Sequence, residues 1–205
     1  MSQAPQDSNP RPQDVDLIRN VVANNKVFID TCSLLAPKYS QLETVLFPII
    51  KEMGNKLIIA ERVIGELKDI KADSNHKRCE QAHQILKNID KHNREGLISI
   101  QGEKSDNFPD NVFLTVFAKF RLQHHLALIT QDVALAHDLL KLNDSKSQDG
   151  KEISVFRITS YGTLGKNDGD LEKQQAARSG EGRQGDGQQG QNTINLTPLA
   201  EKKTV

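Results

Sequence analysis

The chain has 205 residues, of which 36% are hydrophobic and 4% aromatic, and it contains no tryptophan. This length favours one domain with appendages, and the low apolar content indicates that part of the chain is disordered. Lys plus Arg and Asp plus Glu both total 27, so the formal net charge is zero, which excludes a strongly basic nucleic-acid-binding protein and an acidic solvating tail.

The two cysteines, Cys32 and Cys79, are too few for a disulfide framework and show no zinc-ligand spacing. A reducing compartment is therefore expected. The first residues are polar and proline-containing, unlike a signal peptide, and no apolar run reaches the roughly 18 residues that suggest a membrane span. We predict a cytoplasmic protein that has no membrane partner.

Polar sequence is concentrated at the two ends. Residues 1–13 are predicted to be a disordered leader, and residues 166–205 a disordered tail rich in Gly and Gln. A short apolar stretch at 193–200 could dock on a partner, on a second subunit or on the domain, or it could be a frayed end. Between them, residues 14–165 form a predicted domain of about 150 residues, enough to bury a core.

Short apolar runs alternate with segments of helical spacing along this domain. The predicted strands are 26–30, 57–60, 97–100, 126–130 and 153–158. The predicted helices are 41–53, 61–71, 75–92, 109–124 and 133–142. Because the strands are apolar along their length, they favour a parallel sheet with helices on both faces. We therefore predict an α/β fold, a three-layer α/β/α sandwich with a central parallel sheet of about five strands.

Four carboxylates lie next to these predicted strands. Asp30 ends the first strand, Glu66 lies one turn into the helix after the second, and Asp132 follows the fourth. Asp110 opens the helix that precedes the fourth strand. Ligands of open α/β sheets bind beyond the carboxyl ends of the strands, so we expect these four acids to gather at one edge.

Gathered carboxylates repel one another unless a cation neutralises them. A site made only of oxygen ligands suits Mg²⁺ or Mn²⁺. Such an ion could orient a scissile phosphate, lower the pKa of bound water and offset charge on the leaving oxygen. No complete P-loop or dinucleotide-binding fingerprint competes with this interpretation, since the glycines at 162 and 165 match neither.

These acidic segments, taken in order, resemble the PIN domain family. The resemblance is carried by KVFIDTCSLL at 26–35, VIGEL at 63–67, Asp110-Asn111 and LITQD at 128–132, and it spans about residues 26–158. Cys32 stands where the family usually has Asn or Ser. The interval of 22 residues between Asp110 and Asp132 is longer than in the compact toxin members, and the Gln/Gly tail lies outside the family pattern.

The resemblance implies a metal-dependent endoribonuclease with a PIN-like fold that cuts single-stranded or structured RNA. The catalytic and metal-binding residues that it implies are Asp30, Glu66, Asp110 and Asp132. It also implies that Thr31 or Thr130 helps to fix carboxylates and solvent. The expected reaction is attack of metal-bound water on phosphorus, which leaves a 5′-phosphate and a 3′-hydroxyl.

Each acid also has an ordinary structural interpretation. Asp30 and Asp132 could cap helices, Glu66 could be an exposed helix residue, and Asp110 could be a favourable charge in a first helical turn. An acid that closes an apolar strand is costly without a partner, which favours a site at Asp30. The four acids together favour a site over four separate structural roles.

Basic side chains near the acids are candidates for contacts with RNA phosphates, although charge runs are also typical of solvated helix faces. They are Lys68, Lys71, Lys77, Arg78, Lys119 and Arg121. Phe108 could meet a base.

Two alternatives to a processing or defence nuclease stay open. The first is a toxin ribonuclease whose tail binds an antitoxin, and the second is a PIN-like scaffold that binds RNA or protein without cutting. A homo-oligomer is compatible with each. A haloacid dehalogenase-like enzyme is disfavoured, because Cys32 stands where its second acid would follow Asp30.

Overall fold

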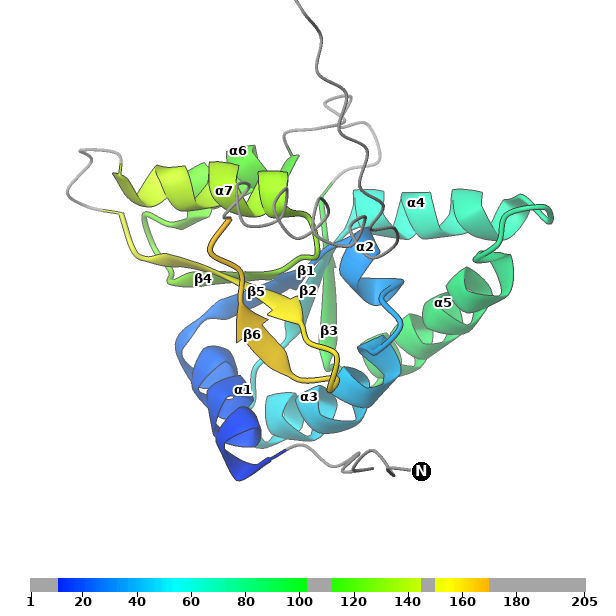
Figure 1. Ribbon diagram of the computed structural model, residues 1–205, viewed down its shortest axis with the longest axis horizontal. Helices are drawn as coiled ribbons and strands as arrows, with labels where there is room; N and C mark the ends of the chain where they lie inside the picture. Colours follow the sequence, from blue (N-terminus) through cyan, green and yellow to red (C-terminus); the bar gives the residue numbers. More distant parts are fainter. Residues whose placement is uncertain (1–10, 103–111, 145–149, 170–205) are drawn as a thin grey trace, which may run out of the picture.

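A mixed, mostly parallel sheet forms the centre of the molecule in the computed structural model, which describes residues 11–102, 112–144 and 150–169 (Figure 1). Its six strands in this part of the chain are β1 (Lys26–Ile29), β2 (Leu57–Ala60), β3 (Ile98–Gln101), β4 (Leu126–Ile129), β5 (Ile153–Ile158) and β6 (Leu164–Lys166). They lie in the order β3-β2-β1-β4-β5-β6, and only β6 runs antiparallel to its neighbour.

Helices connect the strands. They are α1 (Pro12–Asn24), α2 (Thr31–Leu34), α3 (Tyr39–Met53), α4 (Glu61–Ala72), α5 (Cys79–Arg94), α6 (Val112–Phe120) and α7 (Val133–Lys141), followed by the short 3-10 helix η1 (Leu142–Asp144). The five predicted strands and the helices between them are confirmed, with ends that differ by a few residues. The start of the helix predicted at 109–124 lies outside the described residues.

The position of β1 in the sheet determines which residues meet at the carboxyl edge of the central strands. The chain first adds β2 and β3 on one side of β1, then returns to add β4 and β5 on the other. Ile29, the last residue of β1, pairs with Ile59 on one side and with Ile129 on the other. The residues that follow these three strands therefore share the carboxyl edge of the sheet, at the point where the strand order reverses.

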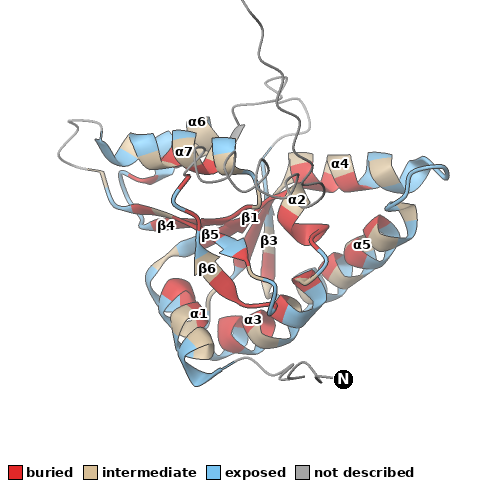
Figure 2. Ribbon diagram, viewed as in Figure 1, coloured by how far each residue is buried: buried red, intermediate tan, exposed pale blue. Residues whose placement is uncertain are grey.

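Two apolar clusters lie on opposite faces of the sheet. Val27 and Ile29 belong to the cluster formed with α1, α3, α4 and α5, whereas Phe28 belongs to the cluster formed with α6 and α7. This division follows from the strand itself, because successive side chains point to opposite faces. Buried residues accordingly line both faces of the sheet in Figure 2.

Several expectations about the ends of the domain are corrected. Helix α1 begins at Pro12, inside the predicted leader, and proline suits a first helical turn, where no backbone donor is lost. The sixth strand, β6, was not expected and makes the sheet mixed. It carries the fold beyond residue 165, since Lys166 pairs with Phe156 and Asn167 is buried. Residues 1–10 and 170–205, including the stretch at 193–200, lie outside the described residues.

Among the described residues no helix is both long enough and apolar enough to cross a membrane.

Candidate active site

Asp30 is the first residue beyond the central strand β1. It is 6% exposed and caps α2, because its Oδ1 accepts a hydrogen bond of 2.8 Å from the Ser33 amide. Its Oδ2 accepts hydrogen bonds from the Cys32 thiol, at 2.9 Å, and from the Thr130 hydroxyl. Burial raises the pKa of Asp30, and these donors oppose the rise because they stabilise the carboxylate.

None of the three donors to Asp30 carries a positive charge. In the described part of the chain no Lys, Arg or His forms an ion pair with this carboxylate. A buried carboxylate that lacks a cation is unfavourable. The surroundings of Asp30 therefore favour either a bound proton or a cation that enters the site from outside the chain.

Asp132 is linked to Asp30 through Thr130. The fully buried Thr130 donates its hydroxyl hydrogen to Asp30 and accepts a hydrogen bond of 2.9 Å from the Asp132 amide. Asp132 caps α7, because its Oδ1 accepts from the amides of Ala134 and Leu135 at 2.8 and 3.1 Å. Its other carboxylate oxygen has no hydrogen-bond partner among the described residues, so it is available to a ligand.

Glu66 reaches the site from α4, the helix that follows β2. Its Oε1 accepts a hydrogen bond of 2.7 Å from Arg62, one turn earlier on the same helix, and its Oε2 accepts from the Thr31 hydroxyl on α2. These two contacts orient the carboxylate although the side chain is partly exposed. Two threonines thus hold two of the acids, Thr31 at Glu66 and Thr130 at Asp30.

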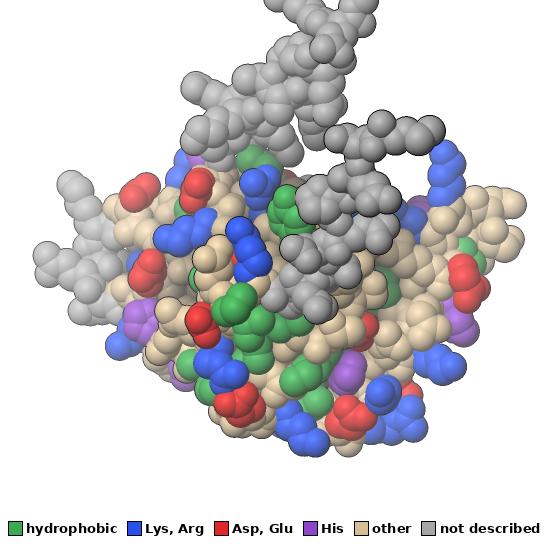
Figure 3. Space-filling view, turned by 60° about the horizontal axis from the view of Figure 1, so that its bottom comes forward, with side chains coloured by type: hydrophobic (Ala, Val, Ile, Leu, Met, Phe, Trp, Pro, Cys, Tyr) green, Lys and Arg blue, Asp and Glu red, His purple; other side chains and the backbone are tan. Residues whose placement is uncertain are grey.

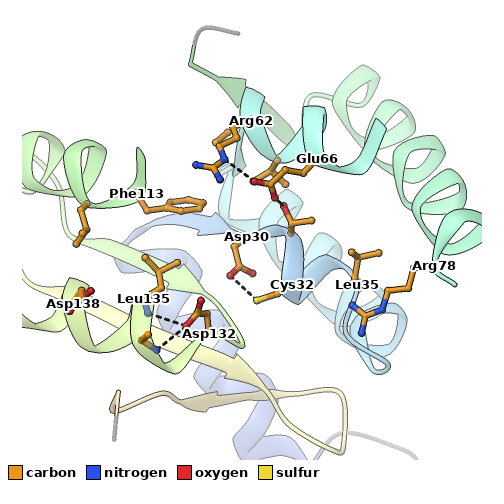
Figure 4. Close-up of a pocket in the computed structure, with 15 residues that line it drawn as sticks. Asp30, Cys32, Leu35, Arg62, Glu66, Arg78, Phe113, Asp132, Leu135 and Asp138 are labelled. Carbon is orange, nitrogen blue, oxygen red and sulfur yellow. Dashed lines mark hydrogen bonds and ion pairs between the residues drawn. The ribbon is translucent and has the colours of Figure 1, made fainter. Parts of the chain in front are cut away.

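A cavity of about 540 Å³ lies over the carboxyl ends of β1, β2 and β4, and Asp30, Glu66 and Asp132 all line it (Figure 4). In Figure 4 the Asp30 carboxylate lies between the other two acids. Arg78 is at one end of the cavity, and the ring of Phe113 is at the other. The structure therefore brings together three of the four predicted acids, from three separate parts of the chain.

The fourth acid, Asp110, lies outside the described residues, and so does Phe108. Of the six basic candidates, Arg78 lines the cavity, whereas the four lysines are exposed and do not line it. On the face shown in Figure 3, Lys and Arg side chains are interspersed with Asp and Glu, and no broad positive surface is seen. Arg78 is therefore the candidate best placed to meet a phosphate in the cavity.

The prediction that Arg121 contacts RNA is wrong. Arg121 is 6% exposed, its Nη1 donates to the carbonyl of Leu142, and its backbone carbonyl accepts a hydrogen bond from Lys151. It packs so closely on Gly150 that a Cβ there would meet the guanidinium. Its side chain joins the end of α6 to η1, its backbone carbonyl contacts the segment before β5, and Arg121 does not line the cavity.

Some residues of the cavity were missed from the sequence. Arg62 is four residues before Glu66, a spacing that places an Arg and a Glu together on one helix face, and this signal could have found it. Asp138 also lines the cavity, and it is half exposed beside His137 and Lys141. Only the fold could place Phe113 there.

The helix-capping interpretation of Asp30 and Asp132 is confirmed. It does not exclude a site, because a capping bond uses only one of the two carboxylate oxygens in each case. An ionised carboxylate has about four acceptor positions, so both residues keep positions that a ligand could use.

The donor set can be compared with the needs of a divalent cation. Among the described residues, no group of three His, Cys, Asp or Glu side chains is arranged to hold a metal ion. Mg²⁺, however, usually keeps several waters and binds through one or two carboxylates. Asp30, which lacks a cation, and Asp132, which has a free oxygen, fit a hydrated ion of this kind better than a closed cage of protein ligands.

No family model, no curated protein and no solved structure matches this chain. A proposal about its function therefore depends on the sequence pattern and on the geometry of the cavity.

Proposed function

We propose that this chain is a metal-dependent endoribonuclease of the cytoplasm, with the three-layer sandwich of a PIN-like domain. The observation that supports it best is the cavity at the carboxyl edge of the sheet, which Asp30, Glu66 and Asp132 enter from three different elements. Asp110, outside the described residues, is the fourth acid of the proposal.

Asp30 and Asp132 are the residues that would hold Mg²⁺ or Mn²⁺. When bound, the ion would make water more acidic and offset negative charge on the phosphate and on the leaving oxygen. Thr130 links Asp30 to Asp132, because its hydroxyl donates to the Asp30 carboxylate and accepts a hydrogen bond from the Asp132 backbone amide. Asp30 supplies a negative charge that no Lys, Arg or His of the described residues pairs with.

Glu66 is suited to accept a proton from water at its carboxylate, because Arg62 and Thr31 hold it in place at the cavity wall. Arg78 is suited to contact a phosphate oxygen. In the proposed reaction, water adds to phosphorus and the bond from phosphorus to the 3′ oxygen breaks. The 3′ oxygen takes up a proton, which leaves a 5′-phosphate and a 3′-hydroxyl.

The test is cleavage of end-labelled RNA and single-stranded DNA by the purified protein, with Mn²⁺ and with a chelator. We expect cuts in RNA only with the metal, with ends that carry a 5′-phosphate. Asp30→Asn should reduce the cleavage rate at least a hundredfold, whereas Asp69→Asn, which changes an exposed acid of α4 that does not line the cavity, should not. Equal rates for wild type and Asp30→Asn would exclude the mechanism.

A scaffold that binds RNA without cutting it is the second candidate. It is favoured by one observation, that no three described acids or other metal-ligand side chains are arranged around one ion. Titration calorimetry with Mn²⁺ separates the two. Binding of Mn²⁺ that Asp30→Asn abolishes supports the nuclease, and RNA binding without any binding of Mn²⁺ supports the scaffold.

A further inference from the structure

We call the cavity that Asp30, Glu66 and Asp132 line the acidic cavity. A second, smaller cavity of about 200 Å³ lies beside it, between α6 and the sheet. We call it the aromatic pocket, and Phe28, Phe113, Phe120, Ile58, Val116 and Gln101 contribute to its lining. The chain has seven phenylalanines, so three of them meet at this one place. Such a concentration is unexpected in a protein with 4% aromatic residues.

The two cavities adjoin. Ala60, at the end of β2, and Phe113, on α6, line both of them. A ligand that extends past Asp30 toward Phe113 therefore reaches the aromatic pocket next. A nucleotide has this form, because its charged phosphate and its flat base are joined by one sugar.

The aromatic pocket has the chemistry that unpaired bases use. Bases stack on aromatic side chains and form hydrogen bonds along their edges. Phe120 is 37% exposed, so its ring is accessible, whereas Phe28 is buried and packs against Phe117, whose ring centroid is 5.0 Å away. The Gln101 amide, at the end of β3, adds a hydrogen-bond donor and an acceptor to an otherwise apolar lining.

The volume also limits the ligand. Pockets for drug-sized molecules measure roughly 300–1,000 Å³, so a pocket of about 200 Å³ suits one ring system. We propose that the aromatic pocket binds the unpaired base of the nucleotide next to the scissile phosphate, with stacking on Phe120 and Phe113 and selection of the base by Gln101. This proposal rests on the proposed binding of RNA in the acidic cavity.

Binding in chelator tests the pocket without cleavage. Fluorescence anisotropy measures the affinity of the full chain for short labelled single-stranded RNA in which an abasic unit replaces each nucleotide in turn. For the wild type we expect an abasic unit at one position to weaken binding about tenfold. Phe120→Ala should weaken binding of the intact RNA about as much, and the abasic unit should then cause no further loss.

Two variants control for folding and position. Phe120→Leu keeps an apolar side chain but removes the ring, and it should lose affinity as Phe120→Ala does. Leu122→Ala changes an exposed apolar residue two positions away that does not line the pocket, and it should bind like the wild type. Gln101→Ala should keep most of the affinity but reduce the difference between the four bases.

Each outcome of these experiments either supports or rejects the proposed base pocket. If an abasic unit weakened RNA binding equally in the wild type and in both Phe120 variants, the proposal that the aromatic pocket binds a base would be wrong. A change of oligomeric state in sedimentation without a change in RNA affinity would also overturn it, because the pocket would then belong to an interface between copies. Cleavage without base dependence keeps the nuclease and rejects the pocket. Base-dependent binding without cleavage keeps the pocket and rejects the nuclease, and absence of RNA binding both in chelator and with Mn²⁺ rejects both.

Discussion

Asp30 combines burial with negative charge. Its pKa is raised, so the folded protein binds the proton of Asp30 more tightly than the unfolded chain does. Between the ordinary pKa of 3.8 and the raised value, stability therefore falls as pH rises. Ionisation of the buried Asp30 carboxyl therefore lowers the stability of the folded protein.

Asp30→Asn should accordingly raise the free energy of unfolding at pH 7 in chelator, by about 1 kcal/mol, since asparagine keeps the helix cap without the buried charge. The advantage should shrink as pH falls toward 3.8, where the wild-type carboxyl becomes protonated. Urea unfolding of both proteins across this pH range measures it. Added Mn²⁺ should stabilise the wild type alone, and an advantage of the variant that grows at low pH would contradict the assignment.

Cys32 shares the environment of Asp30. Burial and the adjacent Asp30 carboxylate raise the pKa of Cys32 to about 12. Its thiol is therefore protonated at neutral pH and serves as a hydrogen-bond donor to Asp30, a function for which the sequence offered no sign. In this position the cysteine thiol donates a hydrogen bond, as a hydroxyl group would.

We expect Cys32 to react slowly with iodoacetamide at pH 7.5, because little of it is thiolate. Asp30→Asn removes the neighbouring charge and should speed alkylation of Cys32 about tenfold, with Cys79 as the internal control. Peptide mass spectrometry measures both rates in one sample. An unchanged rate at Cys32 in the variant would show that Asp30 does not influence the thiol.

Two helices are capped by an acid at the carboxyl edge of the sheet. Asp30 is the N-cap of α2 and Asp132 is the N-cap of α7, so each residue has a structural and a proposed catalytic role. Substitutions at Asp132 can separate these roles, because asparagine caps helices about as well as aspartate, whereas alanine does not.

Asp132→Asn should leave the free energy of unfolding nearly unchanged, and Asp132→Ala should lower it by about 1 kcal/mol. Both should lose RNA cleavage, because both lack the free carboxylate oxygen. Denaturant unfolding and the cleavage assay, run on the same preparations, provide the comparison. If Asp132→Asn cleaves RNA normally, Asp132 is only a cap.

The predictable elements are those whose apolar residues leave a periodic pattern. Strand β4 is LALI with every residue buried, and α5 shows its buried face at Ala82, Ile85 and Ile89. Strand β6 has three residues, one of them glycine, and its position depends on hydrogen bonds to β5 rather than on a pattern of its own. Helix α1 had the pattern, in Ile18, Val21 and Val22, but it begins within polar sequence.

The site was predictable where a side chain follows a strand end directly. Asp30 and Asp132 follow β1 and β4, so the order of strands in a parallel sheet brings them together. The burial of Arg121 was not predictable, because it depends on how Gly150 and Leu142 close around the end of α6. Contacts between residues distant in the chain, such as that of Phe113 with the cavity, need the tertiary structure.

For the whole molecule, zero net charge predicts a weak dependence of RNA binding on salt. On the face shown in Figure 3, positive charges are dispersed among negative ones, and Arg62 and Arg78 are the described Lys or Arg residues that line the acidic cavity. Because each phosphate contact releases counterions, few contacts give a shallow slope. Non-specific attraction between this protein and RNA should accordingly be small.

Arg78→Ala should weaken RNA binding and reduce the slope of log K against log salt by about 0.7, the contribution of one contact to a single strand. Lys119→Ala, at an exposed position outside the cavity, should change neither. Anisotropy titrations between 50 and 200 mM KCl give both quantities. Equal slopes for Arg78→Ala and the wild type would show that Arg78 does not contact an RNA phosphate.

The pairing of β1 with β4 has a consequence for the chain as it is synthesised. The Thr130 hydroxyl that holds Asp30 comes 100 positions later in the sequence, and β4 is itself held between β1 and β5. A ribosome therefore releases Asp30 and Glu66 long before Thr130 and Asp132 exist, and a chain truncated before β4 carries only part of the acidic cavity. The proposed cutting activity therefore requires that β4 and β5 have been synthesised as well.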